Sequence, residues 1–347
     1  MKVVVVGAGY AGTMAANRIA RRARGAQVTL VNPRPDFVER IRLHELIAGS
    51  GGASRPLAAM LRESVTLRVA AAQKIGDGVV ALTDGDAIDF DRLVYAAGGT
   101  VVAPEGAFAV GAVDDARRAA DQLANLPTDA RVDVVGGGLT GIETTTEVAS
   151  ERPDLRVRLI TDGPVAPSLG RRARARVAAV LDRLGVETVR AEWNSPGDAA
   201  LTLWAVARQV SELAEASGLE VDTDGRMVVD ASLRSVSDAR LYAVGDAAAV
   251  PGSRMSCQAA IPQGAHAADA IARESRNRAP KPYSMGFTAQ CVSLGRRDGV
   301  VQRVHRDDSP AGAWLGGRAA AFVKEQVCRS TVVATRSSQY AWMPGPS

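Results

Sequence analysis

Two stretches of the chain share one pattern of hydrophobic and polar positions. VVVVGAGYAGTMAANRIA spans residues 3–20, and VDVVGGGLTGIETTTEVA spans residues 132–149. Each begins with a short β-branched run, continues with three spaced glycines and ends in a tail typical of a helix. A continuous β-branched run indicates a buried strand of a parallel sheet. Each stretch therefore predicts a strand, a tight turn and a helix.

Further apolar runs extend the alternation of strands and helices. We expect strands at 28–31, 66–70, 79–82, 91–95, 156–160, 201–204, 227–229 and 241–244, and helices at 171–184 and 258–272. The strands at 66–70 and 79–82 are expected to form part of a meander. From residue 283 the pattern weakens to short strands and one helix around 318–329. Parallel strands joined by crossover helices predict an α/β fold.

Composition narrows the function. The chain has 347 residues, 46% of them hydrophobic, which is enough for at least two domains. Its net charge of +4 is spread without long blocks and its aromatic content is only 4%, so a nucleic-acid surface is not expected. No uncharged apolar run has the length of a membrane span. We expect a cytoplasmic protein with at most peripheral contact with a membrane.

Cysteines and histidines give no sign of a metal site. Cys257, Cys291 and Cys328 are odd in number, far apart in sequence and without the spacing of metal ligands. His44 and His266 also have no ligand companions, so each is expected to be a surface or supporting residue. The sequence therefore predicts no metal, and the chemistry has to come largely from an organic cofactor.

The glycine spacing has a mechanical reason. In G-x-G-x-x-G the first glycine permits a tight turn, the second lets the backbone approach a pyrophosphate, and the third lets helix and strand pack closely. The helix N-terminus then offers N–H groups to the phosphates. A purely structural turn is the alternative, but both copies have the strand and helix context of a dinucleotide site. The six residues are Gly7, Gly9, Gly12, Gly136, Gly138 and Gly141.

Other polar residues near the two loops leave alternatives open. Asn32 stands where an acid usually binds the ribose, and an amide can still bond a hydroxyl. In the second unit this position is near Thr161, and the arginines that follow it leave both NADH and NADPH possible. Glu143 is either a carboxylate that reaches the nicotinamide or an ordinary helix acid. Glu147 is expected to be an exposed helix acid.

The two glycine loops, the AAGGT turn at 96–100 and LYAVGD at 241–246 together resemble the two-dinucleotide-fold flavoprotein reductases. This resemblance implies two Rossmann-like dinucleotide-binding domains, the second inserted in the first. It implies that the first loop holds FAD and the second NADH or NADPH. It assigns Gly7, Gly9, Gly12, Gly245 and Asp246 to FAD, and Gly136, Gly138, Gly141 and Glu143 to the nicotinamide cofactor. Asn32 and Gly98 are further candidates for binding a cofactor.

The resemblance also implies domain boundaries. The FAD-binding domain would be split into 1–105 and 236–282, around an NAD(P)H-binding domain at 106–235. Residues 283–347 would form a small C-terminal region that contacts the electron acceptor or a partner. A thin apolar stripe at Phe322, Val323 and Val327 would suit a homodimer interface.

The segment CQAAIPQGAHAADAI at 257–271 is similar to a region of type II NADH:quinone dehydrogenases. The resemblance implies a quinone or other small conjugated acceptor, and it makes Gln258 and Gln263, together with Glu143, the candidate catalytic residues. The match departs at Cys257 and Pro262, and Gln263 falls one place late. No cysteine pair is expected beside the flavin, so the dithiol chemistry of related reductases and sulfide oxidation are not expected.

The chain departs from the family pattern near residues 186–200, where we expect the second domain to lack strands. Such a trimmed sheet would expose apolar surface unless something else covers it. One hypothesis is therefore that NAD(P)H binding is weak. The alternatives to the reductase are a flavin-dependent oxidase or dehydrogenase that acts directly on an organic metabolite, and a protein in which FAD is only structural.

Overall fold

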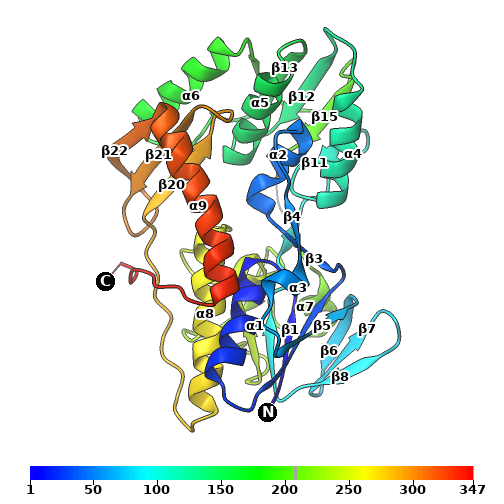
Figure 1. Cartoon of the computed structure of the whole chain (residues 1–347), viewed down its shortest axis with the longest axis vertical. Helices are drawn as coiled ribbons and strands as arrows, with labels where there is room; N and C mark the ends of the chain where they lie inside the picture. The colour runs from blue at the N-terminus through cyan, green and yellow to red at the C-terminus, as the bar shows by residue number, and fades with distance from the viewer. Residues whose placement is uncertain (207–208, 347) are drawn as a thin grey trace.

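The computed structural model describes residues 1–206 and 209–346, which form three packed parts (Figure 1). The first part contains a five-stranded parallel sheet with the order β18-β9-β1-β2-β5. Its strands and main helices are β1 (Lys2–Val6), α1 (Tyr10–Arg22), β2 (Gln27–Asn32), β5 (Val65–Val69), β9 (Arg92–Tyr95), β18 (Leu241–Ala243) and α8 (Cys257–Glu274).

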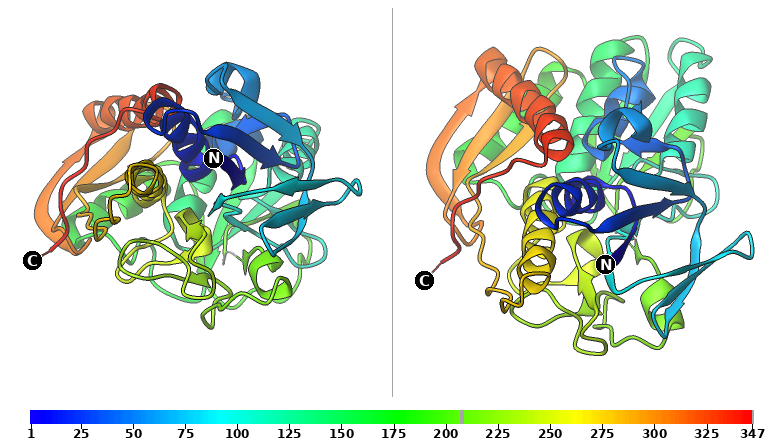
Figure 2. Two further views of the ribbon diagram at one scale, coloured as in Figure 1. Left: turned by 90° about the horizontal axis from the view of Figure 1, so that it is seen from below. Right: turned by 60° about the horizontal axis from the view of Figure 1, so that its bottom comes forward.

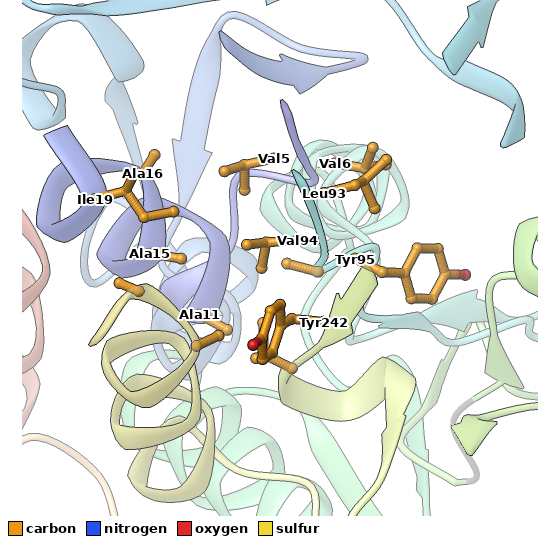
Figure 3. Packing of buried hydrophobic residues seen from close by; sticks show 14 of the residues in the cluster. Val5, Val6, Ala11, Ala15, Ala16, Ile19, Leu93, Val94, Tyr95 and Tyr242 are labelled. Carbon is orange, nitrogen blue, oxygen red and sulfur yellow. The ribbon is translucent and has the colours of Figure 1, made fainter. Parts of the chain in front are cut away.

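Helices α1 and α8 pack against each other at very close range. A Cβ atom added to Gly264 of α8 would lie 2.2 Å from the carbonyl oxygen of Ala11 in α1, so only glycine fits there. Small side chains on α1 allow the same approach to the sheet, and Figure 3 shows Ala11 beside Tyr242 of β18. The residues before and after the inserted second domain thus share one core.

A meander and several short elements complete the first part. Strands β6 (Ala72–Gly76), β7 (Val79–Leu82) and β8 (Ala87–Asp89) form an antiparallel meander. The expectation of a meander strand at 66–70 is wrong, because β5 pairs in parallel with β2 in the main sheet. Short elements are β3 (Asp36–Val38), α2 (Leu43–Ala48), β4 (Ser54–Pro56), α3 (Leu57–Met60), β10 (Gly99–Thr100), β16 (Gln209–Val210), α7 (Leu213–Ala216), β17 (Met227–Val228) and β19 (Ala248–Ala249).

The second part repeats the design with a sheet in the order β11-β15-β12-β13-β14, in which all strand pairs are parallel. Its elements are β11 (Phe108–Ala109), α4 (Val113–Ala124), β12 (Arg131–Val135), α5 (Leu139–Glu151), β13 (Arg156–Thr161), α6 (Arg171–Arg183), β14 (Glu187–Arg190) and β15 (Leu201–Trp204). The chain returns to the first core before the expected residue 236, because Ala214, Met227 and Leu233 are already buried there.

Residues 191–200 connect β14 to β15 directly and cover the edge of the second sheet. The Trp193 ring packs edge-to-face on Trp204, with 5.4 Å between ring centroids. Pro196 lies against Gly106, and Asp198 forms an ion pair with Arg131. The apolar surface that a shortened domain would expose is thus covered by this connection.

The third part is a three-stranded antiparallel sheet with one long helix: β20 (Ala289–Ser293), β21 (Gly299–Val304), β22 (Pro310–Gly316) and α9 (Gly317–Ser337). Helix α9 extends beyond the expected 318–329 and packs against α1. Figure 2 shows the C-terminal segment running from α9 along the side that carries β20–β22. There the backbone N–H of Gly286 donates to the carbonyl of Met343 over 2.9 Å. No helix among the described residues is both long and apolar enough to cross a membrane.

Candidate functional site

A cavity of about 780 Å³ lies where the three parts meet. Its wall includes the first glycine loop at residues 7–11, the turn at Gly245 and Asp246, and the N-terminal turn of α8. Glu143 of α5 and Lys324 of α9 also line it. Sequence segments that carry the predicted motifs therefore converge on one space.

The first glycine loop has the shape of a phosphate cradle. Gly7 has φ +99°, and an added Cβ would lie 2.2 Å from the Ala96 carbonyl oxygen. A Cβ on Gly12 would lie 1.9 Å from the carbonyl oxygen of Gly7. By contrast, a Cβ on Gly9 would meet no atom within 4 Å. Gly7 and Gly12 thus allow the tight backbone packing of the turn. Gly9, the middle glycine, leaves open space in front of the α1 N-terminus, as a bound pyrophosphate requires.

The second loop has the same geometry. Gly136 has φ +124° and a Cβ there would lie 3.0 Å from the Ala205 carbonyl oxygen, while a Cβ on Gly141 would lie 1.9 Å from the Gly136 oxygen. A Cβ on Gly138 would again meet open space. Leu139 opens α5 and lines the large cavity, so this cradle adjoins it. The glycines of both loops fit dinucleotide phosphates.

Asn32, Gly98 and Asp246 also line the cavity. The Asn32 side-chain oxygen accepts a hydrogen bond from the Ala8 N–H at 3.0 Å, and its amide nitrogen donates to the Arg34 carbonyl at 2.8 Å. Asn32 therefore braces the first glycine loop with the groups that would bind a ribose. Its predicted contact with the ribose of FAD stays a prediction.

The two candidate catalytic glutamines have different surroundings. Gln258, in the first turn of α8, lines the cavity, and its amide contacts the Thr288 hydroxyl at 2.8 Å. Gln263 is absent from the described residues that line the large cavity. Its side-chain oxygen accepts from the Gly245 N–H at 2.7 Å, and its nitrogen donates to the Ser253 hydroxyl at 3.0 Å. Gln263 thus supports the Gly245 turn from behind, instead of facing the cavity.

Glu143 and Lys324 form a buried ion pair, with 2.8 Å between Oε1 and Nζ. The Ser293 N–H donates to the same carboxylate oxygen at 3.0 Å. Burial is the largest single effect and raises the pKa of Glu143, but Lys324, His44 and the Ser293 N–H together outweigh it and lower the pKa of this carboxyl. Burial likewise opposes the charge on Lys324, while Glu143 raises its pKa above the ordinary value. The cavity wall therefore holds one fixed positive and one fixed negative charge.

Lys324 is a site residue that the sequence pattern does not predict. The helix around it is expected only to carry an apolar stripe, although Lys324 and Cys328 are spaced four residues apart and so share a helix face. Only the position of α9 beside α5 and α1 reveals that this face is turned toward the cavity. The ion-pair partner of a buried acid cannot be read from the acid's own segment.

All three cysteines line the same cavity although they are far apart in sequence. Cys257 begins α8, Cys291 lies in β20 and Cys328 lies in α9, and all three are free thiols. Burial raises the pKa of each thiol, that of Cys328 to about 12. They are therefore protonated near neutral pH and add weakly polar surface to the wall.

Glu147, expected to be exposed, and His44, expected to be a surface or supporting residue, are both buried. Glu147 is 0% exposed and His44 is 3% exposed, because α2 packs against α5 between them. Figure 1 shows α2, which belongs to the N-terminal region, reaching up to α4 and α5 of the second part. The expectation of an exposed Glu147 is wrong, since the covering helix comes from a distant part of the chain. No group of three His, Cys, Asp or Glu side chains suited to a metal ion occurs within the described ranges.

Comparisons with known proteins agree with this architecture. Residues 1–264 match the pyridine nucleotide-disulphide oxidoreductase family. The chain is 33% identical over 275 residues to an NADH dehydrogenase-like protein of Mycobacterium tuberculosis. This alignment covers 66% of this chain and 68% of that protein. It is 27% identical over 205 residues to ferroptosis suppressor protein 1 of Homo sapiens, which covers 55% of this chain and 52% of that protein.

Solved structures share the fold at low sequence identity. The sulfide:quinone oxidoreductase from Aquifex aeolicus superposes with a TM-score of 0.80 and 17% identity, over 97% of this chain and 92% of that chain. NDH2 from Plasmodium falciparum in complex with NADH gives a TM-score of 0.79 and 14% identity, over 97% and 96%. The predicted α/β class with two Rossmann-like dinucleotide-binding domains is confirmed.

Proposed function

We propose, from the premise that the chain belongs to the pyridine nucleotide-disulphide oxidoreductase family, that it transfers electrons from NADH or NADPH to a quinone-like or other small conjugated acceptor. As a member of this family, the chain is an FAD-dependent NAD(P)H oxidoreductase. The identity of the electron acceptor is the part that we propose. The observation that carries the proposal is that two complete phosphate cradles adjoin one cavity with a Glu143–Lys324 pair in its wall.

The residues of the first cradle suit FAD. The open space at Gly9 and the N-terminus of α1 would receive the pyrophosphate, and the turn at Gly245 and Asp246 would face the ribityl part. When bound, FAD supplies the two-electron chemistry that neither thiols nor carboxylates of this wall provide. Gln263 keeps the Gly245 turn in place through the hydrogen bond to its N–H.

The residues of the second cradle suit the nicotinamide cofactor. The pyrophosphate would lie at Gly138, and the first turn of α5 would lead the nicotinamide toward the cavity, where Glu143 is held by Lys324. The intact geometry of Gly136 and Gly141, together with the covered edge at Trp193, supports functional rather than weak nicotinamide binding.

The third part of the chain forms the wall on the proposed acceptor side. Thr288, Cys291, Val327 and Tyr340 line the cavity there. Such a mixture of aromatic, aliphatic and weakly polar side chains suits a flat conjugated molecule. The quinone activity stated in the name of the Aquifex aeolicus structure agrees with this proposal. Glu143 and Lys324 would supply charge and hydrogen bonds beside the reacting atoms.

An anaerobic titration tests the function directly. We expect the purified protein to show flavin absorbance, which NADH or NADPH bleaches and a water-soluble ubiquinone analogue restores. The nucleotide that bleaches faster is the donor. A protein whose flavin no nucleotide bleaches is not a reductase; bleaching by an organic metabolite alone would then support the oxidase, and no bleaching at all the structural flavin. Bleaching that no quinone reverses would contradict the proposed acceptor.

A further inference from the structure

A group of charged and titratable side chains, of which only Arg296 is exposed, extends from the cavity toward the surface between α2, α5, α9 and the turn that joins β20 to β21. We call it the junction cluster, and it consists of His44, Glu45, Glu143, Glu147, Arg296 and Lys324. The electron transfer described above uses only its inner end, the Glu143–Lys324 pair. Electron transfer gives no role to the other four members, His44, Glu45, Glu147 and Arg296.

The junction cluster has an inner and an outer end. Glu143 lines the cavity, and Glu147 lies one turn further along the same face of α5. Glu147 accepts a hydrogen bond from the Ser50 hydroxyl and lies 3.8 Å from Arg296. Ser50 is half-buried, and the Arg296 side chain is 37% exposed. The outer end is therefore next to solvent, while the inner end is next to the site of chemistry.

Two buried polar atoms in the junction cluster have no hydrogen-bond partner among the described residues. They are Nε2 of His44 and Oε2 of Glu147. An unsatisfied buried polar atom costs about 1–3 kcal/mol, so such atoms are rare and call for a reason. Each of these atoms is able to carry a proton in one state of its side chain and to accept one in the other.

The surroundings of Glu147 favour proton exchange near neutral pH. Burial raises the pKa of Glu147 to about 7, and Ser50 and Arg296 only partly oppose this while Glu45 and Glu151 add to it. Burial lowers the pKa of His44, which faces Glu143, Lys324, Glu45 and Arg296 from α5, α9, α2 and the β20–β21 turn. Near pH 7 His44 is therefore neutral and Glu147 is partly protonated, unlike the charged Glu143 and Lys324.

We propose that Glu147 and His44 conduct protons between the surface beside Ser50 and the Glu143–Lys324 pair at the cavity. This inference rests on the proposed function. With a quinone-like acceptor A, the balanced reaction is NAD(P)H + H⁺ + A → NAD(P)⁺ + AH₂. The nicotinamide supplies a hydride, and water supplies one proton per turnover. Glu147 takes that proton from the surface and His44 passes it inward, where it replaces the proton that Lys324 gives to the reduced acceptor, while Glu143 keeps Lys324 in place.

Four variants separate the pathway from a structural role. Glu147→Gln and His44→Gln keep size and hydrogen-bonding capacity but stop proton transfer. Glu187→Gln and His305→Gln are matched controls, because Glu187 in β14 and His305 are exposed. Equal flavin content and equal melting behaviour of the four proteins at one pH would show that they fold alike.

We expect the two pathway variants to lose at least about tenfold in quinone turnover, less than the 10²-fold or more of a direct general acid. Anaerobic bleaching by the nucleotide should stay within about twofold of the natural chain, because hydride transfer needs no proton from water. The solvent deuterium isotope effect on turnover should rise, and the basic limb of the pH profile should shift. Both controls should match the natural chain in all measurements.

An infrared titration gives a readout that does not depend on turnover. The flavin-loaded protein should show a protonated-carboxyl band that disappears around pH 7, and Glu147→Gln alone should remove it. Normal bleaching combined with unchanged turnover, pH profile and isotope effect in Glu147→Gln and His44→Gln would overturn the pathway and leave the reductase intact. Absence of bleaching in the natural chain would instead refute the proposed function, and the pathway with it.

Discussion

Replacing Glu147 by glutamine should remove part of the pH dependence of the protein's stability. The carboxyl is 0% exposed, and burial raises its pKa from the ordinary 4.5 to about 7. Between these two values the folded state holds a proton that the unfolded state has lost. Stability therefore falls as pH rises through this window, since stability decreases with pH wherever the folded state binds more protons.

The size of the effect follows from the two pKa values. Relative to the fully protonated state, Glu147 costs about 0.8 kcal/mol at pH 5 and about 3.3 kcal/mol at pH 8. Glu147→Gln has no such cost, so it should gain about 2.5 kcal/mol on the natural chain between these pH values. With an unfolding entropy of about 2.1 cal/mol/K per residue, this corresponds to about 3 °C in Tm for 347 residues.

Thermal melting of the flavin-loaded protein at several pH values measures this difference. The Tm of Glu147→Gln minus that of the natural chain should increase steadily from pH 5 to pH 8. Glu187→Gln, which changes an exposed acid of β14, should show no such trend. Parallel pH profiles of Glu147→Gln and the natural chain would refute the reasoning, because they would mean that Glu147 ionises as freely in the folded state as in the unfolded one.

Three further changes test other parts of the structure. Gly141→Ala brings a Cβ within 1.9 Å of the Gly136 carbonyl, so it should abolish bleaching by NAD(P)H while flavin absorbance persists; an unchanged rate of bleaching would contradict the cradle. Lys324→Met leaves the Glu143 carboxylate buried without its cation, so denaturant unfolding should show a loss of about 3–5 kcal/mol, and adding Glu143→Gln should recover most of it. A double variant no more stable than the single one would argue against the ion pair. Trp193→Ala should cost at least the 0.5–1.5 kcal/mol typical of an aromatic pair, measured by the same unfolding assay, and no loss would mean that residues 191–200 do not hold the sheet edge.

Sequence alone predicted the elements that local patterns determine. The two strand–turn–helix units and the strand at Leu201–Trp204 agree with the structure, because β-branched runs and glycine spacing act within a few residues. Helix α9 was underestimated, since its second half is rich in Ser, Thr and Cys, whose helical face is recognisable only when its partner α1 is known.

The site itself depended more on contacts between distant segments. The glycines of both cradles carried their own signal, and the structure gives them the expected geometry. In contrast, the burial of Glu147 depends on α2, which lies about a hundred residues earlier in the chain. The meeting of Cys257, Cys291 and Cys328 in one cavity likewise follows from topology, about which spacing in the sequence says nothing.

The split first sheet has a consequence for how the protein folds during its synthesis on the ribosome. The second sheet is complete once Trp204 has been made, whereas the first still lacks β18 and α8, which end at residues 243 and 274. Domains generally fold as units during synthesis, and nonlocal contacts form slowly. The nicotinamide domain can therefore mature first, while the first sheet still lacks the strand that pairs with β9 and the helix that packs on α1. Flavin therefore binds late in synthesis. Chaperones are most important for the nascent chain in the interval before the flavin binds.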